Sequence, residues 1–334
     1  MSQKWVSAVV LLMLGCSRQA REGSEAGTSS SPLREVVFEG TCDASGAVPL
    51  GGGLLVVADD EDNVLRVYDA RTGGAPLRSV NLSPSLGLEQ KKRPPEVDIE
   101  AATRFGELAL WMGSHGRSSS GKPQPSRLRF FATTAPANGE GITLVGTPTS
   151  RLLEDLLADP RYARFGLQQA SELPPKTVGG LNIEGMTAMA DGGGVLIGFR
   201  SPVPEGRALL VPLLNPRELA QGEPARFGDP MQLDLQGLGI RSLSWWRGRY
   251  LIIAGGTAGE AVSRLFSWKG GAEAPVPVPG VDLSGLNPEA FFTDEAQEEV
   301  LVISDDGSRV RGGVECKRLK DAAQKHFRAV WVKP

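Results

Sequence analysis

Short apolar runs alternate with polar turns along most of the chain, and the alternation repeats roughly every fifty residues. Each repeat opens on a short polar motif, and a second polar motif follows the second apolar run. A period of this length, stretched once by an insertion, is typical of propeller architectures. We therefore predict an all-β fold, a five-bladed β-propeller. The five opening motifs are centred on Ser45, Glu100, Glu184, Arg241 and Glu289.

The two ends of the repeat array complement each other. The fifth repeat has strand-like runs at 289–293, 300–304 and 327–332, one fewer than a four-stranded blade needs, whereas 33–39 precedes the first repeat. We expect 33–39 to be the outer strand of the last blade, which would close the ring and remove an open sheet edge. Six blades are the alternative, if two blades are merged across 152–181.

Helical spacing of apolar residues is confined to short segments. The run 151–157 places leucines at helical intervals, and Pro160 ends or kinks the helix. This predicts one helical insertion, at about 151–181. Shorter helices are expected near 217–220 and 319–324.

The first residues are typical of an export signal. Lys4 precedes an apolar segment, 6–14, that is too short to span a bilayer, and the segment ends at Cys16 in a sequence that resembles a bacterial lipobox. We predict a lipoprotein signal peptide at 1–16, a flexible tether at 17–32 and the propeller at 33–334. The protein would be a monomer in the cell envelope, lipid-anchored on the outer-membrane or periplasmic side, or secreted if the signal is a simple secretory one. Its membrane contact would be through the lipid alone.

Two cysteines remain in the predicted propeller. Cys42 lies near its start and Cys316 near its end, so in an oxidising compartment one disulfide is expected. Two unpaired buried thiols are the alternative.

The charge balance gives no reason to expect nucleic acid as a partner. The chain has 36 Lys and Arg against 39 Asp and Glu, a formal net charge of −3. Two histidines are too few for a transition-metal site built on several imidazoles. Walker, dinucleotide-binding and Gly-x-Ser-x-Gly motifs are missing from the sequence.

Antiparallel strands bring the start of the first strand and the end of the second to one face of a propeller, so the polar motifs should meet at one channel mouth. Carboxylates facing one axis must be neutralised. A Ca²⁺ or Mg²⁺ ion could bind Glu100, Glu184 and Glu289. Alternatively, arginines could pair with these carboxylates directly, the candidates being Arg117, Arg200 and Arg241.

The second polar motifs supply further candidates. Asp59, Asp60, Asp305 and Asp306 could contact a ligand or could serve only as turn residues. His115 is a candidate proton-transfer residue, with a hydrogen-bonded loop position as the alternative.

At these motifs the chain resembles a bacterial family labelled only as a domain of unknown function (thirty-six-sixteen). The Asn-x-Glu-Gly pattern at 182–185 looks, more distantly, like that of secreted phytase-like and esterase-like propellers, which use acidic residues and Ca²⁺ around the channel. The family resemblance spans nearly all of 34–334, and it is carried by the runs 42–46, 58–63, 98–100, 113–117, 182–185 and 304–307.

We expect from this sequence a small polar or anionic ligand at the channel mouth, held by the arginines, with a divalent cation on the glutamates. Metal-dependent hydrolysis of a phosphate or carboxylic ester is the enzymatic alternative, and it follows from the more distant resemblance. A scaffold that binds a protein partner through its outer loops is the third possibility.

Overall fold

The computed structural model describes Met1 and residues 33–88, 94–257 and 262–334. The predicted signal peptide with Cys16 and the predicted tether lie outside the described residues. None of the described helices is long and apolar enough to cross a membrane.

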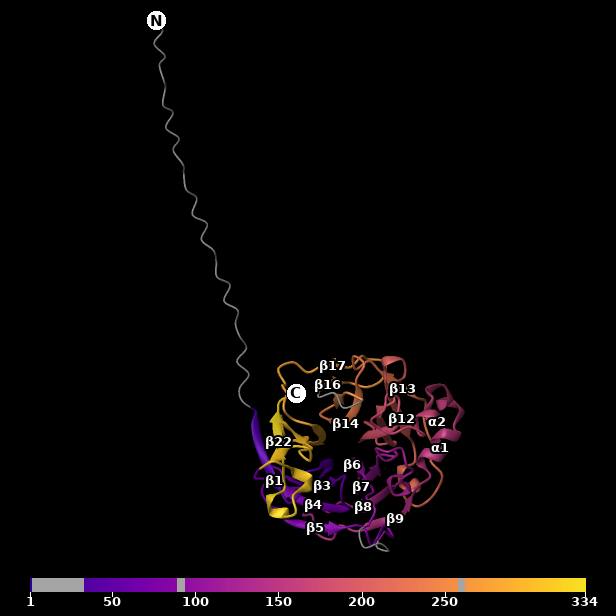
Figure 1. Cartoon of the computed structure of the whole chain (residues 1–334). Helices are drawn as coiled ribbons and strands as arrows, with labels where there is room; N and C mark the ends of the chain where they lie inside the picture. Colours follow the sequence, from indigo (N-terminus) through magenta and orange to yellow (C-terminus); the bar gives the residue numbers. More distant parts are fainter. Residues whose placement is uncertain (2–32, 89–93, 258–261) are drawn as a thin grey trace. The chain divides into compact units, whose positions relative to one another are not determined.

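Residues 33–334 form a five-bladed β-propeller, as the repeats predict (Figure 1). Each blade is a four-stranded antiparallel sheet, and the innermost strands of neighbouring blades contact one another in a closed ring.

Blade one contains β2 (Ala44–Pro49), β3 (Leu54–Asp59), β4 (Val64–Asp69) and β5 (Arg78–Asn81). Blade two contains β6 (Ile99–Phe105), β7 (Leu108–Gly113), β8 (Phe130–Thr134) and β9 (Leu144–Thr149). Blade three contains β10 (Asn182–Ala188), β11 (Val195–Ser201), β12 (Ala208–Leu213) and β13 (Met231–Leu233). Blade four contains β14 (Gly239–Trp246), β15 (Arg249–Gly255), β16 (Ser263–Trp268) and β17 (Val276–Pro277).

Blade five is assembled from both ends of the propeller. Its strand order is β18 (Pro288–Phe292), β19 (Val300–Ser304), β22 (His326–Val332) and β1 (Arg34–Glu39). β1 pairs with β22 in antiparallel register along its whole length. The predicted closure by an N-terminal strand is therefore confirmed, and the six-bladed alternative is excluded because 152–181 adds no strand.

The helical insertion after blade two consists of three short helices, α1 (Leu152–Ala158), η2 (Pro160–Phe165) and α2 (Leu167–Ala170). Their buried side chains pack into the core cluster that blades two and three share. A further helix, α3 (Pro216–Leu219), lies where one was expected. The segment expected to be helical near 319–324 instead carries two 3₁₀ turns, η4 (Cys316–Arg318) and η5 (Ala322–Gln324), after a small hairpin of β20 (Val310–Arg311) and β21 (Val314–Glu315).

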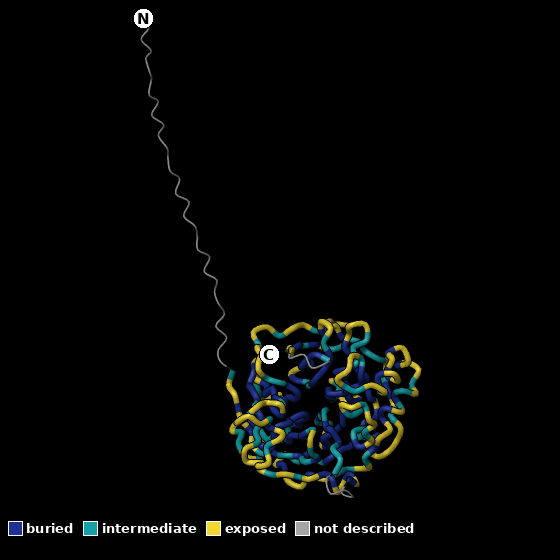
Figure 2. Tube along the Cα trace, in the orientation of Figure 1, coloured by how far each residue is buried: buried dark blue, intermediate teal, exposed yellow. Residues whose placement is uncertain are grey.

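The hydrophobic core is divided into five clusters, one at each interface between neighbouring blades. In Figure 2 buried residues lie mainly inside the ring and exposed residues mainly at its periphery. Side-chain hydrogen bonds supplement the apolar contacts: the Thr103 hydroxyl of blade two accepts from Ala188 N (3.2 Å), and the Thr187 hydroxyl of blade three accepts from Trp245 N (2.9 Å). The innermost strands are thus held in fixed register around the channel.

The junction of blades five and one carries additional links. Cys42, just before β2, forms a disulfide with Cys316, the first residue of η4, and their Cα atoms are 5.9 Å apart. Beside it, the Phe38 and Phe327 rings stack with centroids 4.9 Å apart. The disulfide closes a loop of 274 residues, so in the chain-entropy description it restricts the unfolded state strongly.

Replacement of both cysteines, Cys42→Ser with Cys316→Ser, is expected to lower the free energy of unfolding by about 3–5 kcal/mol. Urea unfolding of the double variant and the parent chain, followed by tryptophan fluorescence, measures the loss. Adding reductant to the variant should change nothing further. Equal midpoints for the variant and the parent would contradict a stabilising role for this link.

Candidate functional site

A β-bulge interrupts the innermost strand of every blade near its start. In blade two, for example, Ile99 pairs with Gly113 and Ala101 with Met112, so Glu100 is the extra residue without a partner. A bulge of this kind redirects one side chain and is common next to functional sites. The residues in the five bulges are those that the sequence repeats aligned: Ser45, Glu100, Glu184, Arg241 and Glu289.

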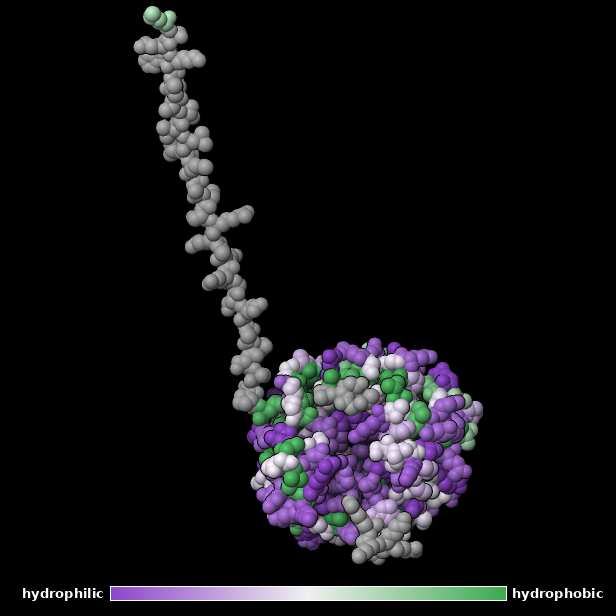
Figure 3. Space-filling view, in the orientation of Figure 1, coloured by the Kyte–Doolittle hydropathy of each residue, from purple (hydrophilic) through white to green (hydrophobic). Residues whose placement is uncertain are grey.

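These bulges lie between two cavities of the channel. Glu100, Glu184 and Glu289 line both a cavity of about 640 Å³ at the mouth and a cavity of about 390 Å³ farther along the channel. Figure 3 looks onto the mouth and shows hydrophilic residues gathered around a central hollow. Nine acidic side chains and five basic ones are among the described residues that line the mouth cavity. The mouth is therefore acidic overall.

Two of the glutamates are neutralised by arginines. Glu184 accepts a hydrogen bond of 2.6 Å from Arg200 Nη1, and its Oε2 lies 3.5 Å from Arg241 Nε. Arg241 also donates to Glu289 and, at 2.6 Å, to Asn287 Oδ1. Arg241 of blade four therefore bridges the glutamates of blades three and five. This is the direct ion pairing that the sequence left open as an alternative to a metal.

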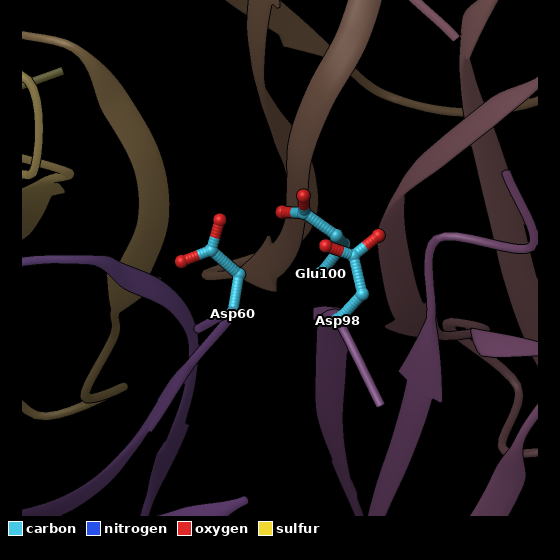
Figure 4. Close-up of side chains that lie close together, drawn as sticks. All are labelled: Asp60, Asp98 and Glu100. Carbon is cyan, nitrogen blue, oxygen red and sulfur yellow. The ribbon is translucent and has the colours of Figure 1, made fainter. Parts of the chain in front are cut away.

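No arginine of the described residues pairs with Glu100 in this way. Its Oε2 is buried and has no hydrogen-bond partner among the described residues, and the same holds for Asp60 Oδ1. Asp60, Asp98 and Glu100 each place a carboxylate oxygen within 4.8 Å of the others. Figure 4 shows the three carboxyl groups projecting in the same direction from the strand ends. A group of three carboxylates with two unsatisfied buried oxygens has a pronounced deficit of positive charge.

Asp98 is the best supported member of this group. It lies at φ 56°, in the left-handed region that Asp tolerates better than most residues. Its carboxylate accepts a hydrogen bond from the Ser114 hydroxyl and lies 2.9 Å from Arg127 Nη1. Arg127 is also shared with Glu96. These contacts hold Asp98 in place and neutralise it in part.

Burial and mutual repulsion raise the pKa values of the mouth carboxyls. Burial, and then the charges of neighbouring carboxylates, holds the pKa values of Asp60 and Glu100 well above their usual range. Burial likewise raises the pKa of Asp43 to about 7 and that of Glu289 to about 8, although Arg241 acts against the shift at Glu289. The pKa of Asp98 rises only to about 6, because Arg127 and Ser114 oppose the effect of burial. Without an added cation the mouth therefore retains protons near neutral pH.

The structure separates the predicted aspartates into two groups. Asp60 and Asp305 line the mouth cavity. Asp59 instead accepts from the backbone N–H groups of Glu61 and Asp62, and Asp306 pairs with Arg328 at 2.7 Å. Asp59 and Asp306 are not among the residues that line the described mouth cavity. The contacts of Asp59 are those of a turn residue, whereas Asp306 forms an ion pair within blade five.

Of the predicted basic and proton-transfer residues, some line the mouth cavity and others do not. Arg200 and Arg241 line the mouth but are bound to glutamates, whereas the Arg117 guanidinium donates to the carbonyl oxygens of Ser171 (2.8 Å) and Gly121 (3.1 Å). His115 is buried, with Nδ1 2.8 Å from Gly113 O, and burial lowers its pKa to about 4. Neither Arg117 nor His115 is among the residues that line the cavity in the described part of the chain.

Several residues that line the mouth were not predicted as site residues, among them Asp43, Asp98 and Lys317. Asp98 was recognised only as part of the motif around Glu100. Asp43 and Lys317 line the mouth directly beside the disulfide cysteines, and Lys317 pairs with Glu61 at 2.9 Å. Their positions next to Cys42 and Cys316 in the sequence were the available signal. Gly307 permits the close approach of Asp43, since a Cβ at this position would lie 1.6 Å from Asp43 Oδ1.

A family profile described as "Protein of unknown function (DUF3616)" matches residues 134–279, from the end of blade two through blade four. Over these residues the match supports the resemblance inferred from the sequence. No curated protein matches the chain.

Several solved structures have a similar fold. The PQQ-bound form of an aldose sugar dehydrogenase from Streptomyces coelicolor is 13% identical with a TM-score of 0.45, covering 90% of this chain and 99% of that one. A GH43 β1,3-galactosidase with galactodeoxynojirimycin is 10% identical with a TM-score of 0.48, covering 87% and 90%. Glutaminyl cyclase from Myxococcus xanthus is 9% identical with a TM-score of 0.45, covering 90% and 98%. At these values the similarities carry no argument about the chemistry of this chain.

In buffer containing EDTA, the free energy of unfolding should fall by roughly 2–3 kcal/mol between about pH 6.5 and pH 8.5. The folded chain keeps protons on Asp43 and Glu289, whose pKa values are about 7 and about 8, whereas the unfolded chain has already released them. Stability due to these protons is complete below the unfolded pKa values and is lost as the pH rises through the folded ones. Urea unfolding at several pH values measures this slope.

The variant Glu100→Gln is the matched comparison. It removes a buried carboxyl whose pKa is raised and which has no arginine partner among the described residues. In EDTA at about pH 8 the variant should be more stable than the parent, by about 1–2 kcal/mol. A less stable variant, or a parent whose stability rises with pH, would contradict the charge deficit inferred here.

Proposed function

We propose that the channel mouth binds a divalent cation at Asp60, Asp98 and Glu100 and, through it, a small polar or anionic ligand. The observation that carries the proposal is the convergence of these three carboxylates, with Asp60 Oδ1 and Glu100 Oε2 buried and without a hydrogen-bond partner among the described residues. Deprotonated carboxylates in this arrangement need positive charge, and a divalent cation would supply it.

The donor set fits a hard cation. All three residues offer carboxylate oxygens, which suit Ca²⁺ and Mg²⁺ better than softer metals. Ca²⁺ accepts a larger and less regular set of oxygen ligands, and the mouth cavity leaves room for water or ligand oxygens to complete it. We therefore assign Ca²⁺ as the first cation to test.

In this proposal Glu184 and Glu289 are partners of the arginines rather than metal ligands. Both are more than nine-tenths buried and in ion pairs with Arg200 or Arg241. Lys317 and Arg127, which also line the mouth, are likewise paired with carboxylates. Of the described residues that line the mouth, only the exposed Lys176 at the rim would then join the cation in attracting an anionic ligand.

Asp43 favours hydrolysis of an ester as a second candidate function. It lines the same mouth, and its pKa of about 7 suits a group that exchanges protons near neutral pH. A bound divalent cation lowers the pKa of coordinated water. Turnover of a phosphate monoester or p-nitrophenyl acetate that is abolished by EDTA and by Asp43→Asn would support this function.

The predicted leader extends the proposal to the cell envelope. Lipidation at Cys16 would anchor the propeller to a membrane through the tether that precedes Leu33. An extracytoplasmic location is compatible with the Cys42–Cys316 disulfide, because such links persist in oxidising compartments. Millimolar Ca²⁺ is also more readily met outside the cytoplasm, where weak sites of this kind are useful.

Thermal unfolding with and without Ca²⁺ tests the cation site. At a Ca²⁺ concentration one hundred times the dissociation constant, binding should stabilise the propeller by about 2.7 kcal/mol. Asp60→Asn and Glu100→Gln should each abolish most of this shift, because each removes one ligand charge. Mg²⁺ serves as the comparison ion.

The control for these variants is Glu154→Gln. Glu154 is an exposed residue of α1, outside both cavities, so its Ca²⁺ shift should equal that of the parent. A parent protein with no shift in Ca²⁺ or Mg²⁺ at any pH between 6 and 8.5 would refute the proposal, as would a shift retained in both site variants.

Fractionation of cells expressing the full chain tests the anchor. The parent should be found in the membrane fraction, and Cys16→Ser should release it to the soluble or secreted fraction. Equal distribution of the two would refute lipidation at this residue.

A further inference from the structure

The second cavity continues the channel beyond the five bulge residues. It has a volume of about 390 Å³ and extends from the glutamates to residues near the hairpin turns of the innermost strands, such as Pro49, Gly106 and Glu295. These turns are at the opposite ends of the strands from the mouth. The channel cavity thus faces the other side of the propeller.

The channel cavity is acidic. Four carboxylates line it: Glu100, Glu184, Glu289 and Glu295. Arg104 is the one basic residue among its described lining residues, and its guanidinium already donates to Gly106 O at 3.0 Å and Pro49 O at 3.1 Å. Arg104 therefore provides little charge to the carboxylates deeper in the channel.

Glu184 borders this space and has one oxygen without a hydrogen bond to the described residues. The residue is 3% exposed, and its Oε2 has no hydrogen-bond partner among the described residues. The nearest cationic atom is Arg241 Nε at 3.5 Å, an ion pair without hydrogen-bond geometry. One oxygen of a deeply buried carboxylate thus makes no hydrogen bond within the described part of the chain.

The walls next to the glutamates are apolar and aromatic. Met186, Leu243 and Phe291 follow Glu184, Arg241 and Glu289 two residues along their strands and line the cavity. Trp245 lies two residues farther along β14 and also lines it, whereas the adjacent Trp246 is packed in the core between blades four and five. The ring of Trp245 is half-buried and is held edge-on against Tyr250, with centroids 4.7 Å apart.

We propose that this channel cavity binds a small organic cation, with its ammonium group against Glu184 and its hydrocarbon part against Phe291 and Trp245. Carboxylates attract the charge, and aromatic faces attract both cations and apolar groups. An inorganic cation would gain nothing from the apolar wall, and a neutral ligand would gain no charge attraction from Glu184. The volume suits an amine with a ring or a short alkyl chain.

This site is distinct from the cation site proposed for the mouth. Asp60 and Asp98 line the mouth cavity and are not among the residues that line the channel cavity, whereas Trp245 and Phe291 line the channel cavity and are not among those of the mouth, within the described residues. Glu100 borders both. The two proposals can therefore fail separately.

Calorimetric titration with benzylammonium and with benzyl alcohol tests the proposal. The two probes have the same ring and nearly the same size, but only the amine is charged at about pH 7. We expect benzylammonium to bind at least about tenfold more tightly to the parent protein, which corresponds to roughly 1.4 kcal/mol. Binding of benzyl alcohol with equal or higher affinity, or no binding of either probe, would overturn the proposal.

Two variants assign the binding to the channel. Trp245→Leu should weaken benzylammonium binding about five- to tenfold and leave the Ca²⁺ shift intact. Asp60→Asn should do the reverse. If Trp245→Leu does not fold, competition decides: benzylammonium should bind with unchanged affinity in saturating Ca²⁺, and displacement by Ca²⁺ would place it in the mouth and contradict the assignment.

Discussion

Arg241 is the residue on which the charge balance of the channel depends. It projects from the bulge of blade four and pairs with carboxylates from blades three and five, so a single guanidinium neutralises parts of two buried glutamates. Arg200 adds a second positive charge, which pairs with Glu184. Removal of a charge from such a network leaves the remaining buried charge uncompensated, which costs several kcal/mol. The network also has a limit, because none of its described arginines contacts Glu100 of blade two, which lies beside Asp60 and Asp98.

The five bulges explain how ordinary blades produce this arrangement. A regular strand alternates its side chains between the two faces of the sheet, and one additional residue breaks that alternation locally. In each blade the additional residue is at the same position, so five redirected side chains form a single layer between the two cavities. Their chemistry differs from blade to blade while the backbone feature is the same. The scaffold therefore fixes where charge is presented, and the residue type decides its sign.

Most of the architecture could be predicted from the sequence because it depends on local periodicity. Alternating apolar runs, glycine turns and the missing strand of the last repeat are sufficient for five blades closed by β1. The repeats also aligned the five bulge residues correctly. The bulges themselves could not be predicted, since they arise from register between strands, and a register shift has no signature in a single strand.

The contacts of individual side chains could be predicted less well from the sequence. The sequence indicated that acidic and basic groups meet at one mouth, but not which of them pair. Arg200 lies near the end of β11 and Arg117 shortly after the equivalent strand β7, yet Arg200 reaches Glu184 while Arg117 donates to the carbonyl oxygens of Ser171 and Gly121. Asp59 and Asp60 are adjacent, but alternation in the chain sends one into a turn and the other into the cavity. Such differences depend on side-chain direction and on long loops, which repeat periodicity does not determine.

Closure of blade five has a consequence for the order of events during synthesis. β1 is made first, and its partner β22 is made last, almost three hundred residues later. Until β22 emerges, β1 has no sheet to join, and the exposed edge of β19 and an incomplete core persist at the junction. A contact of such high sequence separation forms slowly, and unpaired strand edges favour aggregation in the interval. If the chain crosses a membrane in an extended state, β1 and β22 can pair only after the crossing. Chaperones that shield strand edges would then matter most on the far side of that membrane.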